Sequence, residues 1–258
     1  VLRRSAFATH ALGHVGFSGA AGAVFLGVNP VFGLLAFTMS GATGMALLGR
    51  RAATRDIEIG TVLAFMLGLG LLFLSLYKGF ATEAYGILFG EVLGISTAGV
   101  VFTLEASVVV LVATLAVYRR LLFASLDEEV AEAKGLPMLA LGLVFMLLLA
   151  VAISIAVQVI GVLLIFALMV TPAAIAVRVT RSPLGAIVVS ALVAVFSVWL
   201  GLSVAFFINK PYPASFFIVS TSFVIYVTVR TVAALRDWLL PRGGRDEHTR
   251  AAADPGGT

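Results

Sequence analysis

The stretch LPMLALGLVFMLLLAVAISIAV, residues 136–157, holds no charged side chain. A helix needs about 20 mainly apolar residues to cross the hydrocarbon core of a bilayer, so this stretch is typical of a membrane span. The chain continues without a charge as far as Val177, and residues 159–177 form a second stretch of the same kind. Two such stretches in succession predict membrane-spanning helices rather than the core of a soluble domain.

The composition of the whole chain agrees with this interpretation. Of its 258 residues, 61% are hydrophobic and only 12% are charged, and the mean hydropathy is +1.12. So few charged side chains cannot cover a water-facing surface, which excludes a soluble enzyme, a nucleic-acid-binding protein and a disordered chain. The absence of cysteine excludes thiolate metal sites and thiol nucleophiles. We therefore predict an all-α, polytopic integral membrane helix bundle.

Eight stretches are apolar enough to be read as spans: 7–28, 30–49, 57–77, 103–117, 136–157, 159–177, 184–208 and 213–235. Fifteen of the 17 Lys and Arg residues lie at the two termini and in alternate loops, and only Lys78 and Lys210 lie in the intervening loops. Because cytoplasmic loops hold an excess of basic residues, both termini are expected in the cytoplasm. Residues 1–240 are expected to form the transmembrane domain and residues 241–258 a disordered cytoplasmic tail.

Two connections differ from simple loops. On the outer side, residues 79–102 are too interrupted to span and too apolar to be solvated, so we expect them to lie in the interface or to re-enter the membrane. The carboxylates Glu83, Glu91 and Glu105 are interpreted as a solvated rim, with attraction of cations as the alternative. On the inner side, the sequence SLDEEVAEAKGLP at 125–137 predicts a short helix, because acids begin it and Lys, Gly and Pro end it.

The first span contains two histidines at helical spacing. His10 and His14 are four residues apart and therefore lie on one face of a helix, where two imidazoles can share a metal ion. The alternative is structural, with His10 at the cytoplasmic interface and His14 hydrogen-bonded to a neighbouring helix. Ala11 stands where a zinc protease has its glutamate, so an intramembrane metallopeptidase is disfavoured.

Three further features bear on mechanism. Glycine and alanine follow the histidines and form a small-residue face that lets other helices approach closely. Thr171 and Pro172 are expected to break a later span near its cytoplasmic end, because proline frees the carbonyl of Leu168; this break is interpreted as a kink, with a hinge as the alternative. No nucleotide-binding loop of the GxxxxGK[ST] type occurs, so the chain cannot itself hydrolyse ATP in that way.

Three stretches resemble the permease subunits of zinc and manganese ABC importers. Residues 9–14 with Gly19 are similar to the pattern DALSHxxxPG of that family. Residues 126–135 are similar to FDEEfAxaxG, and residues 160–176 to VGxLLvxALLxxPAAtA. Their order and spacing agree, and the resemblance extends over residues 1–235.

The resemblance implies a homodimeric permease that works with two further proteins in a bacterial cytoplasmic (inner) membrane. A short cytoplasmic helix would dock in a cleft of a separate ABC ATPase subunit, through acidic residues and through small residues that permit close approach: Asp127, Glu128, Glu129, Ala131 and Gly135. An extracytoplasmic metal-binding protein would deliver the ion, which would pass between the two permease copies. No nucleic acid and no permanently bound cofactor are expected, since the metal is the transported cargo.

This sequence departs from the family pattern in three places. His14 matches the motif histidine, whereas His10 stands where the family usually has Asp, which gives an all-nitrogen pair that suits zinc better than manganese. Gly13 replaces the usual Ser. Family members also have a further span before the residues that match 2–4 here, so we expect that the family's first helix is missing and that the chain starts late.

We therefore expect a permease that moves a divalent transition metal into the cell, with zinc favoured and manganese or iron as further candidates. The chain is not expected to be an enzyme, because ATP hydrolysis belongs to a partner. One alternative is import of a metal chelate or cofactor such as a siderophore, heme or cobalamin. Another, from a different class, is a membrane scaffold that transports nothing.

Overall fold

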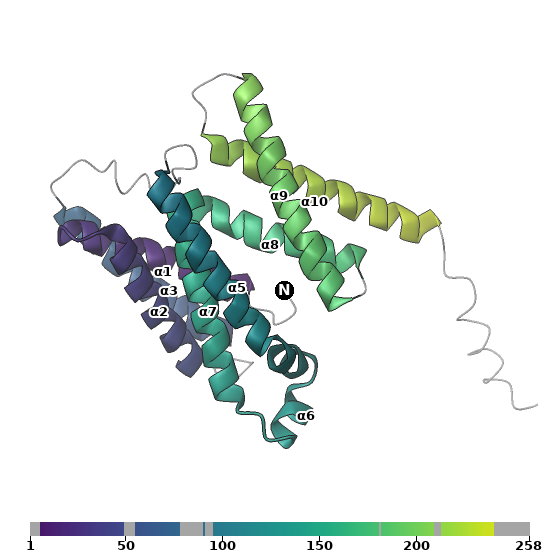
Figure 1. The fold of residues 1–258 in the computed structure, drawn as a ribbon, viewed down its shortest axis with the longest axis horizontal. Helices are drawn as coiled ribbons and strands as arrows, with labels where there is room; N and C mark the ends of the chain where they lie inside the picture. The colour runs from purple at the N-terminus through teal and green to yellow at the C-terminus, as the bar shows by residue number, and fades with distance from the viewer. Residues whose placement is uncertain are drawn as a thin grey trace, which may run out of the picture.

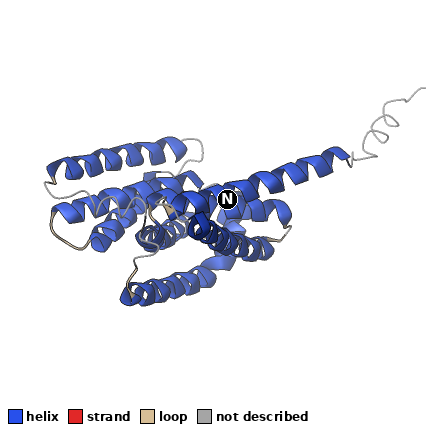
Figure 2. Ribbon diagram, turned by 90° about the horizontal axis from the view of Figure 1, so that it is seen from above, coloured by secondary structure: helices blue, strands red, loops and turns tan. Residues whose placement is uncertain are grey.

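The structure, a computed structural model, describes residues 6–48, 55–77, 90, 95–180, 182–208 and 213–239. These residues form nine helices and no strand (Figures 1 and 2). The all-helical class expected from the sequence is confirmed. The helices are α1 (Ala6–Phe25), α2 (Pro30–Leu48), α3 (Arg55–Leu76), α5 (Thr97–Leu126), α6 (Glu128–Ala133), α7 (Met138–Ile160), α8 (Val162–Val179), α9 (Pro183–Ile208) and α10 (Ala214–Leu239).

Six of the described helices are long and apolar enough to cross a membrane, namely α2, α3, α5, α7, α9 and α10. The expected number of eight is not confirmed, because α1 is rich in small and polar residues and α8 has only 18 residues. α5 is longer at both ends than the predicted span 103–117. It starts after Ser96, whose side chain caps the helix by accepting a hydrogen bond from Gly99 N at 3.2 Å, and it ends at Leu126.

α1 is enclosed by α2, α3, α7 and α8, and most of its residues are buried. Its glycines make this possible. A methyl group added at Gly19 would strike the carbonyl of Gly33 on α2, and one added at Gly33 would strike the carbonyl of Gly19. A methyl group added at Gly70 on α3 would lie 2.8 Å from Cβ of Ser18. The small-residue face predicted for this span is therefore a packing surface.

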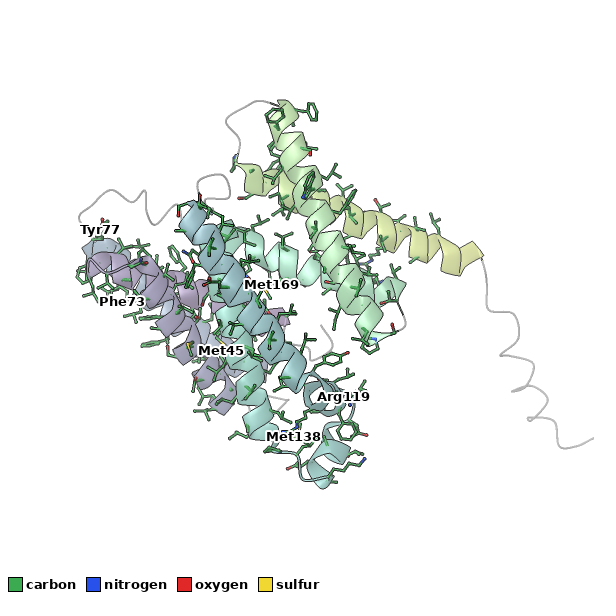
Figure 3. The ribbon with its side chains drawn as sticks, in the orientation of Figure 1. Met45, Phe73, Tyr77, Arg119, Met138 and Met169 are labelled. Carbon is green, nitrogen blue, oxygen red and sulfur yellow. The ribbon has the colours of Figure 1, made fainter. Side chains whose placement is uncertain are left out.

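α2 and α7 are joined by a buried polar contact. The hydroxyl groups of Thr38 and Ser154 lie 2.6 Å apart, so that one donates to the other, and each also lies within hydrogen-bond distance of a carbonyl of its own helix, that of Leu34 at 2.8 Å from Thr38 and that of Ala150 at 2.9 Å from Ser154. Around this pair the core is apolar and includes Met45 of α2, which is fully buried (Figure 3). The two helices are thus held by packing and by a hydrogen bond that lipid cannot replace.

α8, α9 and α10 form a second group of helices, which contacts the rest of the described chain mainly where α8 lies against α1 and α7. We call α1 to α7 the first body and α8 to α10 the second body; Figure 1 shows α9 and α10 on the side away from α2 and α3. Within the second body, a methyl group added at Gly201 of α9 would lie 2.6 Å from Cα of Ile218 on α10. Both bodies therefore use glycine where two helices cross.

The turn that joins the bodies is made by Gly161, which has φ of 78° between α7 and α8. Gly90, with φ of 76°, lies against this turn, and a methyl group there would strike the backbone of Ile160 and Gly161. The rest of 78–94 lies outside the described residues, so the interfacial or re-entrant placement expected there stays a prediction. The tail at 241–258 also lies outside them.

Candidate functional site

His10 and His14 stand together on α1, one turn apart as their spacing predicted. Their ring centroids are 4.6 Å apart and the ring planes meet at 85°. Both side chains are partly exposed, whereas Ala11 and Leu12 between them are fully buried. The pair therefore lies at the edge of the core rather than within it.

α8 supplies the opposite wall of this site. The ring of Phe166 lies 4.8 Å from that of His10, edge to face. A methyl group added at Gly13, which lies between the two histidines, would lie 3.6 Å from Val162 and from Ile165, an ordinary contact distance. The histidine pair is thus located where the first body meets the second.

This arrangement can hold a metal ion from one side. Two imidazoles bound to one zinc ion through nitrogens at about 2.1 Å would have centroids about 5 Å apart, close to the distance seen here. Within the described residues neither ring has a hydrogen-bond partner, and no group of three or more metal-ligating side chains occurs. Two ligands leave the other coordination positions open, which suits an ion in transit better than a structural ion.

The structural alternative required His14 to hydrogen-bond a neighbouring helix. In the described part of the chain its backbone carbonyl accepts a hydrogen bond from Ser18 Oγ of the same helix at 3.1 Å, and its ring makes none to another helix. The local contacts therefore leave the ring nitrogens available to a ligand.

Glu105 has a different position from the one that we predicted. Because α5 starts at Thr97, this carboxylate lies about 12 Å along a helix rather than in a rim beside it. It is exposed, and so are its apolar neighbours Leu104 and Val108. A carboxylate at this depth is costly against lipid, so this face of α5 needs a polar or protein neighbour. Glu83 and Glu91 lie outside the described residues.

α8 continues through Thr171 and Pro172 as one helix, so the break expected there does not end the helix. The proline still has no N–H, which leaves the carbonyl of Leu168 without its usual donor. Pro172 is fully buried. The interpretation of this position as a kink or a hinge stays a prediction.

The short helix expected after α5 is present as α6. The carboxylate of Asp127 caps its start by accepting a hydrogen bond from Val130 N at 2.9 Å. At its end, Gly135 has φ of 77° and donates to the carbonyl of Glu132 at 2.9 Å, and Leu136 donates to that of Ala131 at 3.1 Å. This pair of hydrogen bonds is a Schellman motif, which needs glycine at the residue just past the helix end.

The residues of α6 divide into an inner and an outer face. Ala131 is fully buried against Leu121, Ala124 and Leu141 of α5 and α7. Its small size therefore serves packing within the chain, and the expected role of Ala131 in the close approach of a partner stays a prediction. Glu129 and other residues of α6 are exposed, and so is Gly135, which has no atom within 4 Å of an added methyl group. Glu128 lies in the first turn of α6, and its side chain lies outside the described part.

Comparison with known proteins decides the family. A model described as the ABC 3 transport family matches residues 1–231. The chain belongs to this family. The motif resemblance to permeases of zinc and manganese importers is thereby confirmed, and ABC 3 permeases are transporter subunits whose ATPase is a separate protein.

Relatives with assigned names agree with this placement. The chain is similar to a manganese transport system membrane protein, MntC, of Listeria monocytogenes, with 29% identity over 222 residues, which is 86% of this chain and 79% of the relative. It is also similar to a high-affinity zinc uptake system membrane protein, ZnuB, of Haemophilus influenzae, with 27% identity over 71% of this chain and 70% of the relative. Among solved structures it resembles a chain of PsaBC from Streptococcus pneumoniae in complex with Fab, with 27% identity, a TM-score of 0.76, and coverage of 88% of this chain and 82% of the other.

In this ABC 3 permease, Phe166 forms the aromatic wall of the histidine site and was not predicted from the sequence. Its ring reaches His10 only because α8 crosses α1 at Gly13, and that crossing depends on two helices far apart in the sequence. A glycine directly before the motif histidine was the available signal, because glycine in a helix marks a point where another helix can approach closely.

Proposed function

We propose that this ABC 3 permease moves a divalent transition metal into a bacterial cell, with zinc as the favoured cargo. The observation that carries the proposal is the pair of half-buried imidazoles, 4.6 Å apart, at the boundary between the two bodies. One relative is named for manganese and another for zinc, so the choice of metal rests on the ligands. Two nitrogen ligands favour zinc, whereas a site with a carboxylate in place of His10 favours the harder manganese ion.

The proposed transporter contains a cytoplasmic ATPase subunit, an extracytoplasmic metal-binding protein and a second copy of this chain. The exposed acidic face of α6 supports the ATPase contact, with Asp127, Glu128, Glu129 and Gly135 as the proposed coupling residues. The exposed apolar face of α5, which carries Glu105 at membrane depth, supports coverage by a second copy. The basic residues near α6 support a cytoplasmic location for that end of the bundle in an inner-membrane protein, and both termini are proposed to lie on the same side.

The proposed mechanism uses the boundary between the bodies as a gate. His10 and His14 belong to α1, and the wall that faces them belongs to α8. A shift of the second body against the first therefore changes the space beside the imidazoles without disturbing the core of either body. The chain contributes binding and gating, and the ATPase supplies the energy.

The test is metal uptake by proteoliposomes that contain the permease with its ATPase subunit. His14→Ala is expected to lower ATP-dependent uptake of radiolabelled zinc at least about tenfold, because half of the ligand pair is lost. His248→Ala is the matched control, since His248 is the third histidine of the chain and lies in the predicted tail. Wild-type uptake by His14→Ala, at equal abundance of the complex, would overturn the role of the pair.

A second variant tests the choice of metal. His10→Asp restores the carboxylate that the family usually has and is expected to move the preference from zinc toward manganese in a competition assay. An unchanged ratio of zinc to manganese uptake would contradict the assignment of His10 as a ligand.

The same assay separates the two alternatives. Import of a siderophore, heme or cobalamin would be insensitive to both histidine substitutions. A scaffold would show no ATP-dependent uptake of any of these cargoes in the wild type.

A further inference from the structure

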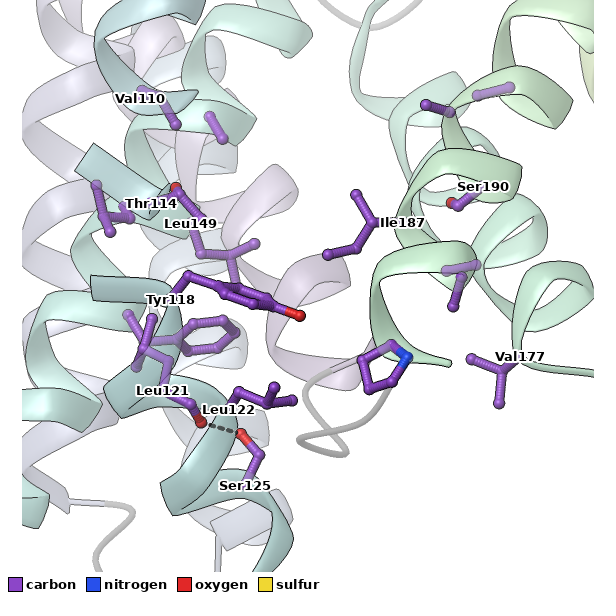
Figure 4. A pocket seen from close by; sticks show the side chains of 18 residues that line it. Val110, Thr114, Tyr118, Leu121, Leu122, Ser125, Leu149, Val177, Ile187 and Ser190 are labelled. Atoms are coloured by element: carbon purple, nitrogen blue, oxygen red, sulfur yellow. Dashed lines mark hydrogen bonds between the residues drawn. The ribbon is translucent and has the colours of Figure 1, made fainter. Parts of the chain in front are cut away.

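An apolar cavity of about 540 Å³ lies between the two bodies, on the side of α5 that faces α9. Its walls come from α5 and α7 of the first body and from α8 and α9 of the second, and it is open on one side (Figure 4). Along α5 it extends from Val110 to Ser125, which is about 22 Å of helix. The size falls in the range of roughly 300 to 1,000 Å³ that is typical of sites for small ligands.

One solvent-shielded polar group in this cavity has no hydrogen-bond partner in the described part of the chain. The hydroxyl of Tyr118 is shielded from solvent and makes no hydrogen bond within the described residues. Figure 4 shows the Tyr118 ring reaching across the gap toward Ile187 with its hydroxyl foremost. A buried phenol without a partner costs free energy, so the occupant of the cavity is expected to offer a hydrogen-bond acceptor at this point.

The position of Tyr118 along α5 indicates which acceptor this is. α5 has 30 residues and is therefore about 45 Å long, which matches a bilayer with its headgroup layers. Tyr118 lies about 12 Å before the end of α5 at Leu126, just inside the roughly 30 Å hydrocarbon core. The ester carbonyls of phospholipids lie at this boundary, and their acyl chains extend from it toward the centre of the bilayer.

Two arginines directly follow lining residues near this end of the cavity, although neither of them lines it. Arg119 directly follows Tyr118 in the chain, and Arg178 directly follows the lining residue Val177. Both side chains are exposed, and neither forms an ion pair within the described residues. Basic pockets between membrane helices on the cytoplasmic side bind anionic lipid headgroups, and arginine side chains are long enough to reach them.

We propose that this cavity binds an anionic phospholipid from the leaflet on the α6 side. One acyl chain fills the space between α5 and α9, an ester carbonyl accepts a hydrogen bond from Tyr118, and the phosphate lies near Arg119 and Arg178. The cytoplasmic identity of that leaflet rests on the orientation in the proposed function. Because the cavity touches both bodies, the bound lipid contacts each side of the proposed gate and makes its movement sensitive to the composition of the membrane.

The test uses the permease with its ATPase subunit in nanodiscs that contain a phosphatidylglycerol with a photoreactive group on one acyl chain. Irradiation is expected to label peptides of α5 between Val110 and Ser125 and peptides of α9. Ala191→Trp places a large ring in the cavity and is expected to reduce this labelling at least about fivefold. Leu192→Trp is the matched control, because Leu192 is exposed on α9 next to Ala191 and does not line the cavity, and it is expected to leave the labelling unchanged.

Two further variants test the headgroup and the ester. Arg119→Gln and Arg178→Gln are each expected to lower the preference for phosphatidylglycerol over phosphatidylcholine, by roughly fivefold for each arginine removed. Tyr118→Phe is expected to weaken labelling by both lipids, because it removes the hydrogen bond to an ester that both carry. Ala186→Leu serves as a milder cavity-filling change if the complex with Ala191→Trp does not assemble.

Three results would overturn the proposal. They are labelling that avoids α5 and α9 in the wild type, equal labelling by phosphatidylglycerol and phosphatidylcholine, and labelling that Ala191→Trp and Ala186→Leu leave unchanged in assembled complexes. The first of these would mean that protein rather than lipid fills the cavity. None of the measurements involves a metal, so the lipid site and the proposed metal transport can fail independently.

Discussion

The two bodies are packed in different ways. In the first body, α1 is surrounded by other helices, and Gly19 and Gly33 bring two backbones into direct contact. The second body contacts the first mainly through α8, and a cavity of about 540 Å³ lies between α5 and α9 where a closer joint would have side chains. This difference indicates that the first body is rigid and that the contact between the two bodies, beside the histidine pair, is the part that can move.

The largest expected effect on stability comes from disrupting the crossing of α1 and α2, where the backbones of Gly19 and Gly33 are in contact. Gly19→Ala places a methyl group against the carbonyl of Gly33 and is expected to lower the free energy of unfolding by about 3 kcal/mol or to prevent assembly. Gly44→Ala is the matched control on α2, because no atom of the described residues lies within 4 Å of an added methyl group there. It is expected to stabilise the helix by up to about 1 kcal/mol. Thermal unfolding in detergent measures both, and equal behaviour of the two variants would contradict the rigidity of the first body.

A smaller effect on stability is expected at Gly135, just past the end of α6. Gly135→Ala has space for its methyl group, but φ of 77° is unfavourable for alanine, so the loss should be about 1 to 2 kcal/mol. Because the strain is local, the change is expected to loosen α6 while the core stays folded. Hydrogen exchange of α6 amides measures this, and ATPase-coupled uptake should fall with it. Unchanged exchange and full uptake together would contradict the assignment of α6 as the coupling helix.

Removal of a buried hydroxyl group is expected to change the free energy of unfolding in opposite directions in the two bodies. Ser154→Ala removes the hydrogen bond to Thr38 in the first body and is expected to cost about 0.6 to 1.7 kcal/mol. Ser197→Ala in the second body removes a buried hydroxyl that has no hydrogen-bond partner among the described residues, so it is expected to be neutral or slightly stabilising. Chemical denaturation of both variants gives the difference between their free energies of unfolding. A larger loss of stability for Ser197→Ala than for Ser154→Ala would contradict this expectation.

The smallest effect on the free energy of unfolding is expected at Gly13, where α1 meets α8. Gly13→Ala meets Val162 and Ile165 at 3.6 Å, so its unfolding free energy should stay within about 0.5 kcal/mol of the wild type. The contrast with Gly19→Ala on the same helix is the informative measurement. A loss as large as that of Gly19→Ala would mean that α8 is fixed against α1 as firmly as α2 is.

Local patterns predicted the fold class and α6, because apolar runs, the acidic start at Asp127 and the glycine at 135 act within a few residues. The early start of α5 was missed, since its cap at Ser96 lies inside a segment that reads as irregular. The histidine pair was predicted from its spacing, but Phe166 and the cavity around Tyr118 were not. Both depend on how α8 and α9 are placed against α1 and α5, and no local pattern contains that placement.

The capping of α6 has a consequence for how force passes through the molecule. A helix of six residues is too short to keep its shape alone, so its direction is set by Asp127, where α5 ends, and by the Schellman motif that leads to α7. One residue, Asp127, joins α5 to α6, and four residues that contain the Schellman motif, 134–137, join α6 to α7. A protein that docks on α6 would therefore act on the ends of α5 and α7 together.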